Sequence, residues 1–211
     1  MGGPVASTSL ALALAAGPSR AGSWVAAVGV PCLGGRAAAE LGVDLDRLVL
    51  VPEAGEQWAV VVAALLEVVD VAVLGLPSRG VRAADARRLT ARARERGAVL
   101  LLLPDPVPVG RGAGSLPGAW PESPELRLGA EAAVWEGLGQ GDGHLRARAV
   151  TLTALGRRGA SRPRSVEVWL PGPDGRVAAR TAGQGSRRTP RGAESGAESG
   201  AARRLADAVG T

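Results

Sequence analysis

The chain has 211 residues, of which 46% are hydrophobic and 2% aromatic, and its formal net charge is +5. All 25 basic residues are arginines, which excludes any reaction that needs a lysine amine. Residues 1–139 hold 12 arginines and 14 acids, whereas residues 140–211 hold 13 arginines and 6 acids. A basic end on a near-neutral body favours an acidic partner, either protein or nucleic acid.

Cysteine content and the start of the chain bear on its compartment. The single cysteine, Cys32, excludes an internal disulfide and is typical of a reducing compartment. No basic segment follows Met1, so we expect no signal peptide, and no apolar run approaches the length of a membrane span. These features predict a cytoplasmic protein without a membrane partner.

Alternating apolar strands and helices in the first half of the chain predict an α/β fold. The expected helices cover residues 10–16, 36–41, 56–68 and 81–96, and the expected strands cover residues 24–28, 48–51, 71–76 and 98–103. A serine or threonine at positions 7–9 is expected to cap the first helix, which should stop at Gly17-Pro18. The last two strands are apolar throughout, so we expect a right-handed βαβ crossover in a parallel sheet, with both strands buried on both faces.

The helix over residues 81–96 should have one apolar stripe and one basic face. The stripe consists of Ala86, Leu89 and Ala93, and the basic face of Arg88, Arg92 and Arg96. We interpret the basic face as a solvated outer surface. The alternative is a contact with an acidic partner or with nucleic acid.

The second half of the chain is richer in turn residues. Ten of the 21 residues in 104–124 are Pro or Gly, which predicts a loop. Short edge strands are expected at 126–128 and 132–135. Residues 176–211 include the repeat AESG-AESG and predict a disordered basic tail.

A hairpin is predicted over residues 144–171. Its two antiparallel strands, 144–155 and 166–170, should be set on the end of the parallel sheet. The connection between them carries the arginines that we take as candidate contacts to a partner or to DNA, namely Arg157, Arg158, Arg162 and Arg164.

The start of the chain holds the one candidate phosphate loop. Gly2 and Ser9 fit the first glycine and the hydroxyl of G-x-x-x-x-G-K-[ST]. Ser7 stands where the second glycine belongs, and Thr8 where the lysine belongs. Without that lysine the loop lacks the charge that reaches the phosphates, so we interpret it as a degenerate remnant or an ordinary turn that binds no cofactor.

Catalytic and metal-binding patterns are missing from the sequence. The strand over 71–76 ends in Gly75 and Leu76 rather than in an acid that could hold Mg²⁺, and Asp70 lies at its opposite end. His144 is the single histidine, and no cluster of His and Cys exists. We therefore expect no catalytic residue, no metal and no enzyme activity.

Several blocks of the chain together resemble one family. They read SWVAAVGVP, GGRAAAELGVDLDRLVLVP, EQWAVVVAALLEVVDVAVLGLP and ADARRLTARARERGAVLLLLP, and they are followed by WEGLGQGDGHLRARAVTLTALGRRGASRPRSVEVWLPGPDG. Over residues 2–175 the chain resembles the RecA-fold ImuA-type proteins, which are also similar to the cell-division inhibitor SulA. The resemblance implies a RecA-like domain over residues 1–175, with a mostly parallel sheet flanked by helices. It also implies that a family segment upstream of Gly2 is missing, and we expect the true start to lie before Met1.

The same resemblance implies a role in the DNA-damage response. Family members are accessory to an error-prone polymerase and its Y-family-like adaptor in mutagenic translesion synthesis. We therefore expect a non-enzymatic accessory protein of the SOS response, whose partners are the adaptor or the polymerase, with RecA as a further candidate. The alternatives are a recombinase-type ATPase, a weak and non-specific DNA-binding protein, and a SulA-like division inhibitor.

Overall fold

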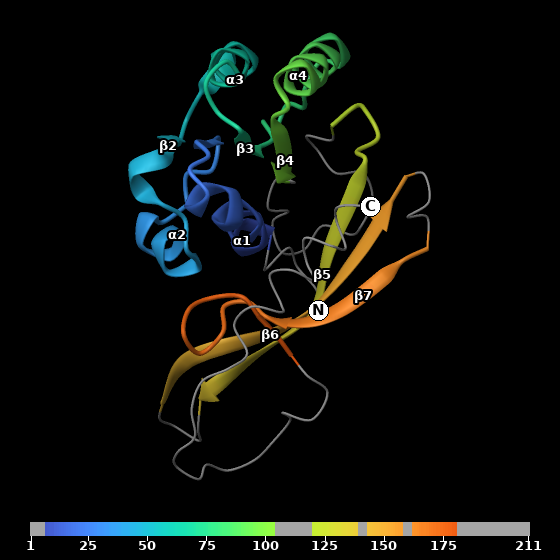
Figure 1. Ribbon diagram of the computed structural model, residues 1–211. Coiled ribbons are helices and arrows are strands. Elements are labelled where there is room, and N and C mark those ends of the chain that lie inside the picture. The colour runs from blue at the N-terminus through green and yellow to red at the C-terminus, as the bar shows by residue number, and fades with distance from the viewer. Residues whose placement is uncertain (1–6, 104–119, 139–142, 158–161, 181–211) are drawn as a thin grey trace. The chain divides into compact units, whose positions relative to one another are not determined.

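Two separate four-stranded sheets organise the computed structural model (Figure 1). The structure describes residues 7–103, 120–138, 143–157 and 162–180. The chain divides between Pro124 and Glu125 into two units, each built around one sheet. The first sheet is parallel with helices and the second is antiparallel, so the fold is mixed α/β. The domain expected over residues 1–175 thus spans both units.

The parallel sheet has the strand order β2-β1-β3-β4. Its central strands are β1 (Val25–Val28) and β3 (Val71–Gly75), and its edge strands are β2 (Leu48–Val51) and β4 (Val99–Leu103). The predicted parallel pairing of β3 with β4 is confirmed. Burial on both faces holds for β3 but not for β4, whose first residue Val99 is exposed, because an edge strand has a neighbour on one side only.

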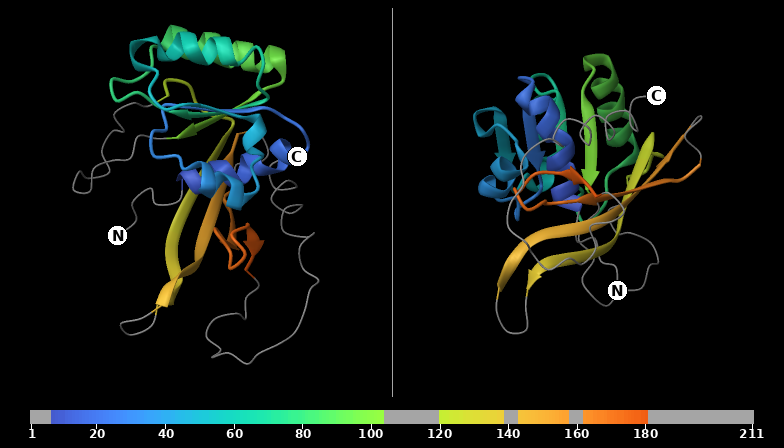
Figure 2. Two further views of the ribbon diagram at one scale, coloured as in Figure 1. Left: turned by 90° about the vertical axis from the view of Figure 1, so that its left-hand side faces the viewer. Right: turned by 60° about the horizontal axis from the view of Figure 1, so that its bottom comes forward.

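Helices cover both faces of this sheet (Figure 2). Helices α1 (Ser7–Arg20) and α2 (Gly35–Leu41) lie on one face, and α3 (Trp58–Leu65) and α4 (Ala83–Arg96) on the other. Successive residues of β1 and β3 alternate between the two cores, as the pleat of a strand requires. One core contains Ala11, Ala15, Val25, Ala27, Val71 and Val73. The other contains Val28, Trp58, Val62, Leu66, Leu74 and Leu89.

Helix α1 is longer at both ends than the sequence predicts. It begins at Ser7, so positions 7–9 lie inside the helix instead of capping it, and it continues through Gly17-Pro18 to Arg20. Proline removes one helical hydrogen bond and usually ends a helix. Here the last turn is held from outside, because the hydroxyl of buried Ser19 accepts a hydrogen bond from the backbone N–H of Asp44 at 2.9 Å.

Helix α4 shows the predicted apolar stripe but not a purely solvated basic face. The stripe residues Ala86, Leu89 and Ala93 are all buried. Arg92 forms an ion pair with the carboxylate of Glu67, and Arg96 donates to the Glu67 carbonyl oxygen. Two arginines of the predicted outer surface therefore hold the connection from α3 to β3.

The loop expected over 104–124 is anchored at its end. Residues 104–119 lie outside the described residues. Trp120 packs against the core beneath α3 and α4, and the Thr90 hydroxyl donates a hydrogen bond to Glu122 at 2.9 Å. Trp120 therefore contributes to the first unit's core.

The antiparallel sheet has the order β5-β6-β7-β8. The predicted hairpin is confirmed as β6 (Gly143–Gly156) paired with β7 (Arg164–Trp169). It is not an extension of the parallel sheet, because β5 (Leu126–Leu138) and β8 (Ala178–Ala179) complete a sheet around it. The two short edge strands predicted near β5 are one strand with two register shifts along β6.

The predicted tail begins later than expected. Strand β8 pairs with β7, and the Arg180 guanidinium lies 3.0 Å from the Glu167 carboxylate and 5.3 Å from the centre of the Trp169 ring. Main-chain pairing and this cation–π contact order a segment that offers little apolar surface. The prediction is wrong for residues 176–180, and residues 181–211 lie outside the described part. No helix in the described ranges has the length and apolar character needed to span a membrane.

Candidate functional site

The carboxyl ends of β1 and β3 lie next to each other in the parallel sheet. The chain leaves β1 toward α2 on one face of the sheet and leaves β3 toward α4 on the other. This creates a topological switch point between two neighbouring strands. Open α/β sheets bind their ligands in the crevice at such a point.

Backbone and an indole ring fill this switch point. Gly29 and Gly75 approach so closely that a Cβ on Gly75 would overlap the Gly29 carbonyl oxygen, and a Cβ on Gly29 would lie 2.8 Å from the Gly75 oxygen. Gly29 also has a φ of 70°, a left-handed conformation that glycine adopts without steric cost. Trp58, only 4% exposed, donates from Nε1 to the Gly75 carbonyl oxygen at 3.0 Å. The strand ends therefore leave no space between them for a phosphate group.

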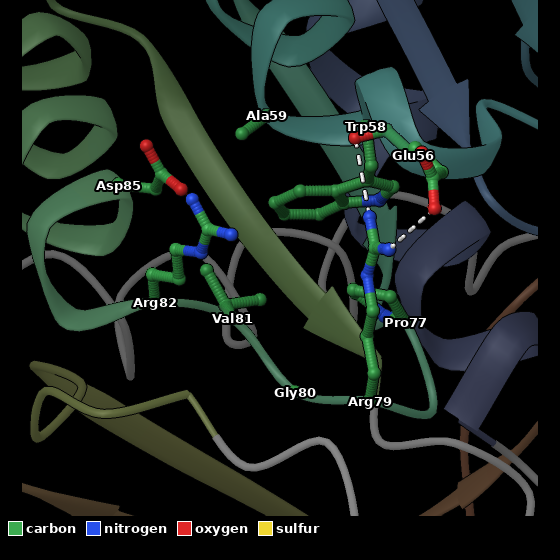
Figure 3. A pocket seen from close by; sticks show the side chains of 9 residues that line it. All are labelled: Glu56, Trp58, Ala59, Pro77, Arg79, Gly80, Val81, Arg82 and Asp85. Carbon is green, nitrogen blue, oxygen red and sulfur yellow. Dashed lines mark hydrogen bonds and ion pairs between the residues drawn. The ribbon is translucent and has the colours of Figure 1, made fainter.

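A pocket of about 330 Å³ lies beside this closed point (Figure 3). It opens between the loop after β2 and the loop after β3, on the face covered by α3 and α4. Arg79 and Arg82 lie on opposite sides of it, with the Trp58 ring between them in the view shown. The lining residues are Glu56, Trp58, Ala59, Pro77, Arg79, Gly80, Val81, Arg82 and Asp85.

This pocket, which we call the Trp58 pocket, is lined by two arginines and two acids, and Arg88 beside it adds a third arginine. Arg79 lies 3.4 Å from the Glu56 carboxylate and also donates to the Glu56 carbonyl oxygen at 3.2 Å. Asp85 pairs with Arg88 at 3.5 Å. Arg82 occupies the N-cap position of α4 and is exposed, and it has no ion-pair partner among the described residues.

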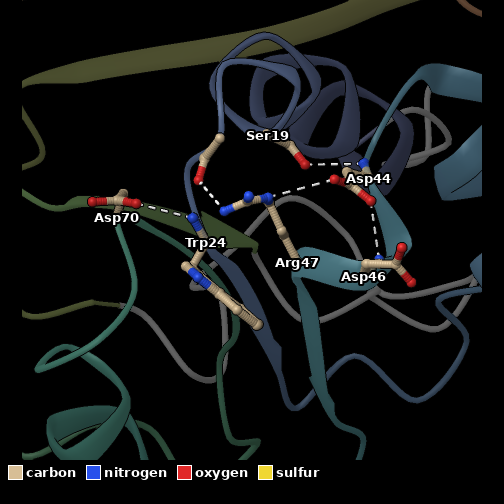
Figure 4. Close-up of polar contacts among 7 residues, drawn as sticks. Ser19, Trp24, Asp44, Asp46, Arg47 and Asp70 are labelled. Carbon is tan, nitrogen blue, oxygen red and sulfur yellow. Dashed lines mark hydrogen bonds and ion pairs between the residues drawn. The ribbon is translucent and has the colours of Figure 1, made fainter.

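Carboxylates at the opposite, amino end of the sheet hold the fold together (Figure 4). Asp44 accepts a hydrogen bond from the Asp46 N–H at 3.0 Å and caps the short 3₁₀ turn before β2. Arg47 lies 3.6 Å from Asp44 and donates to the Gly22 carbonyl oxygen at 2.8 Å. Asp70 accepts from the Trp24 N–H at 2.9 Å. These carboxylates bind backbone groups or a neighbouring arginine and do not form an acid–base pair.

The residues of the candidate phosphate loop belong to a helix. Ser7, Thr8 and Ser9 are half-buried in the first turn of α1, and Gly2 lies outside the described residues. The phosphate-loop motif also ends at the start of a helix, but the lysine that the motif requires is absent. Gly75 ends β3, as the sequence indicates, and its carbonyl is occupied by Trp58.

The arginines predicted as contact residues gather at one end of the β6–β7 hairpin. Arg157 directly follows β6, Arg164 begins β7 and Arg162 lies two residues earlier; all three are exposed. The Arg157 N–H also donates to the Glu125 carbonyl oxygen at 3.0 Å, which holds the residue after β6 against the residue before β5. Arg158 lies outside the described residues.

Sequence reasoning missed the Trp58 pocket. Trp58 lies within the helix expected over residues 56–68 and is buried, but the sequence gives no sign of a role for its indole N–H. Arg79 and Arg82 stand in the loop between β3 and α4. The pocket could have been predicted from the two arginines that follow the carboxyl end of a predicted parallel strand, because ligand sites concentrate at that edge of a sheet.

These features define an α/β protein with a closed switch point and an adjacent charged pocket. Residues 4–109 match the family described as the MT3502 N-terminal domain, and the match covers 106 of the 211 residues. The chain belongs to this family. The matched stretch contains every helix and strand that the structure describes in the parallel-sheet unit.

One curated relative is similar to this chain over part of its length. It is the uncharacterised protein Rv3395c of Mycobacterium tuberculosis, with 44% identity over 94 residues. The aligned region is 44% of this chain and 46% of the relative. The chain therefore matches somewhat less than half of that protein's length.

Proposed function

We propose that the chain is a RecA-like accessory protein of the ImuA/SulA type, which supports error-prone translesion synthesis through protein contacts and catalyses no reaction. The order of the sequence blocks supports this proposal, as does the parallel sheet with helices on both faces. The proposed partners are a translesion polymerase adaptor or the polymerase, with RecA as a further candidate.

The closed switch point carries the non-enzymatic part of the proposal. A nucleotide site at this edge needs open backbone N–H groups, a lysine for the phosphates and a carboxylate for Mg²⁺. Here glycine backbones are in contact, the chain has no lysine, and β3 ends in glycine. The indole N–H of Trp58 donates a hydrogen bond to the carbonyl oxygen of Gly75 at that end of the strand.

We expect no measurable binding or hydrolysis of ATP, because Thr8 cannot supply the charge of the absent lysine. Isothermal calorimetry with ATP and Mg²⁺ tests this on the full chain. Micromolar affinity that disappears in Ser9→Ala would contradict the proposal and favour the recombinase-type ATPase. ADP is titrated in the same way, as a second ligand for the same site.

The hairpin arginines are the proposed contact to the partner. We expect a variant with Arg157, Arg158, Arg162 and Arg164 changed to Ala to fold normally, because exposed loop arginines contribute little to stability. The same variant should lose the polymerase adaptor in a pull-down. Circular dichroism checks the fold, and Arg87→Ala, an exposed arginine of the other unit, is the control.

The pull-down also separates the alternatives. A DNA shift assay at two salt concentrations, run on the same variant, shows whether the arginines bind phosphate, since such binding weakens with salt. If the variant keeps the adaptor and loses only salt-sensitive DNA binding, the hairpin contacts nucleic acid and the protein-contact proposal is wrong. Capture of a tubulin-like filament protein in place of the adaptor would favour the division inhibitor.

A further inference from the structure

We propose that the Trp58 pocket binds a short acidic segment of a partner protein, in which a carboxylate stands next to an aliphatic side chain. The proposal rests on the proposed function, because it names a second surface for protein contacts. It concerns the parallel-sheet unit and not the hairpin arginines. The two surfaces can therefore be tested separately.

The size and walls of the pocket suit an aliphatic side chain. A volume of about 330 Å³ is near the lower limit of ligand pockets, enough for one or two side chains but small for a dinucleotide. Ala59, Pro77 and Val81 provide apolar wall, and all three are half-buried. An aliphatic side chain placed against them would lose apolar surface to water, which favours binding.

The charges of the pocket select a carboxylate. The lining acids Glu56 and Asp85 are each paired with an arginine, whereas Arg82 has no ion-pair partner among the described residues. A guanidinium binds a carboxylate through two parallel hydrogen bonds. The Arg79–Glu56 pair is open to solvent, with side-chain exposures of 57% and 91%. Because such a pair is weak, Arg79 can also turn toward an incoming carboxylate.

The same features disfavour nucleic acid at this pocket. Glu56 and Asp85 flank the arginines and would repel a run of phosphates more strongly than a single carboxylate. Binding of single strands relies on bases stacked on aromatic rings. Trp58 is 4% exposed and its N–H is bound to Gly75, so its ring cannot serve as a stacking platform.

The indole N–H of Trp58 provides a direct readout. The probe is the peptide acetyl-Leu-Glu-Leu-amide, titrated into the full chain labelled with ¹⁵N, and the matched control peptide is acetyl-Leu-Gln-Leu-amide. We expect the Trp58 indole signal, assigned with Trp58→Phe, to shift in a saturable manner with the Glu peptide. The Gln peptide should bind about ten-fold more weakly, because it cannot form the charge-assisted pair.

Two arginine variants localise the effect. Arg82→Gln should weaken binding of the Glu peptide about ten-fold, whereas Arg87→Gln, in helix α4 and outside the pocket, should leave the affinity unchanged. Equal effects of both variants, equal binding of both peptides, or no saturable shift would each overturn the proposal. A competition experiment gives a further test, in which inorganic phosphate or a single-stranded oligonucleotide is added to the complex with the Glu peptide. If either one reverses the shift of the indole signal at a lower concentration than the Glu peptide needs to cause it, the proposal is wrong. A negative titration alongside adaptor capture that depends on the hairpin arginines would overturn this inference and leave the proposed function standing.

Discussion

Replacing Gly75 by Ala is expected to lower the free energy of unfolding of the parallel-sheet unit by about 3 kcal/mol or more. The new methyl group would overlap the carbonyl oxygen of Gly29, which is backbone and cannot rotate away. The two strands are held in register by Val28 beside Leu74, so neither can move without breaking the pairing. Because domains are stable by only about 5–15 kcal/mol, much of the stability of this unit would be lost.

Gly35→Ala is the matched control for this change. Gly35 begins α2, and an added Cβ there would meet nothing within 4 Å. Alanine favours the helix, so we expect a change of no more than about 1 kcal/mol, toward greater stability. Urea unfolding followed by far-ultraviolet circular dichroism measures both variants. If Gly75→Ala unfolds at the same urea concentration as the unchanged protein, the ends of β1 and β3 have room between them, and the argument against a nucleotide site fails.

The strands and helices of the parallel unit follow from local signals. Apolar runs ended by Pro52 and Pro77 predict strands β2 and β3 within one residue, because proline cannot continue the ladder. Gly42 and Gly97 both adopt the left-handed conformation that ends a helix, and α2 and α4 stop directly before them. Proline and glycine end strands and helices through effects on the neighbouring few residues, so these ends can be predicted from a single sequence.

The errors occur where distant residues decide the outcome. Helix α1 continues past Pro18 because Ser19 is buried and bonded to Asp44, 25 positions away. Strand β8 exists because β7 offers it an open edge and because Arg180 binds Glu167. Neither partner can be recognised from the local pattern of apolar residues. Tertiary contacts override the local signals at both places.

The Trp58 pocket depends on strand order, which a single sequence does not state. The pocket forms because β3 lies next to β1, so that the loop after β3 meets the start of α3. The closure at Gly29 and Gly75 also joins positions from separate strands. Gly29 directly follows an apolar strand and Gly75 ends one, and nothing else in the local sequence indicates that the two glycines are in contact. By contrast, the predicted cluster of hairpin arginines needed only an antiparallel pair and a short connection, and Arg157, Arg162 and Arg164 do lie together.

Arg148 is the one arginine of the described residues that is nearly excluded from solvent, with 4% exposure. Its Nε donates to the Leu170 carbonyl oxygen at 2.7 Å, and its guanidinium lies 5.1 Å from the centre of the Trp135 ring. Burial lowers the pKa of Arg148, since loss of hydration penalises the charged form. The side chain nonetheless stays protonated at neutral pH, because the pKa of a free arginine is so high. The antiparallel sheet thus contains a buried cation held by a carbonyl and an aromatic face.

Arg148→Ala is expected to lower the free energy of unfolding of this unit by about 3 kcal/mol, because it removes a charged hydrogen bond and leaves a cavity beside Trp135. Arg148→Met should cost only about 1 kcal/mol, since it refills the volume, keeps a contact with the ring and removes a costly buried charge. Arg146→Ala, on the same strand and exposed, is the control and should change stability by less than about 0.5 kcal/mol. Thermal unfolding is followed by tryptophan fluorescence, in which Trp135 and Trp169 report on this unit and Trp24, Trp58 and Trp120 on the other, so the expected change is confined to the transition of the antiparallel-sheet unit. If Met is as damaging as Ala, the polar contacts of the guanidinium hold β6 to Leu170, and its volume contributes little.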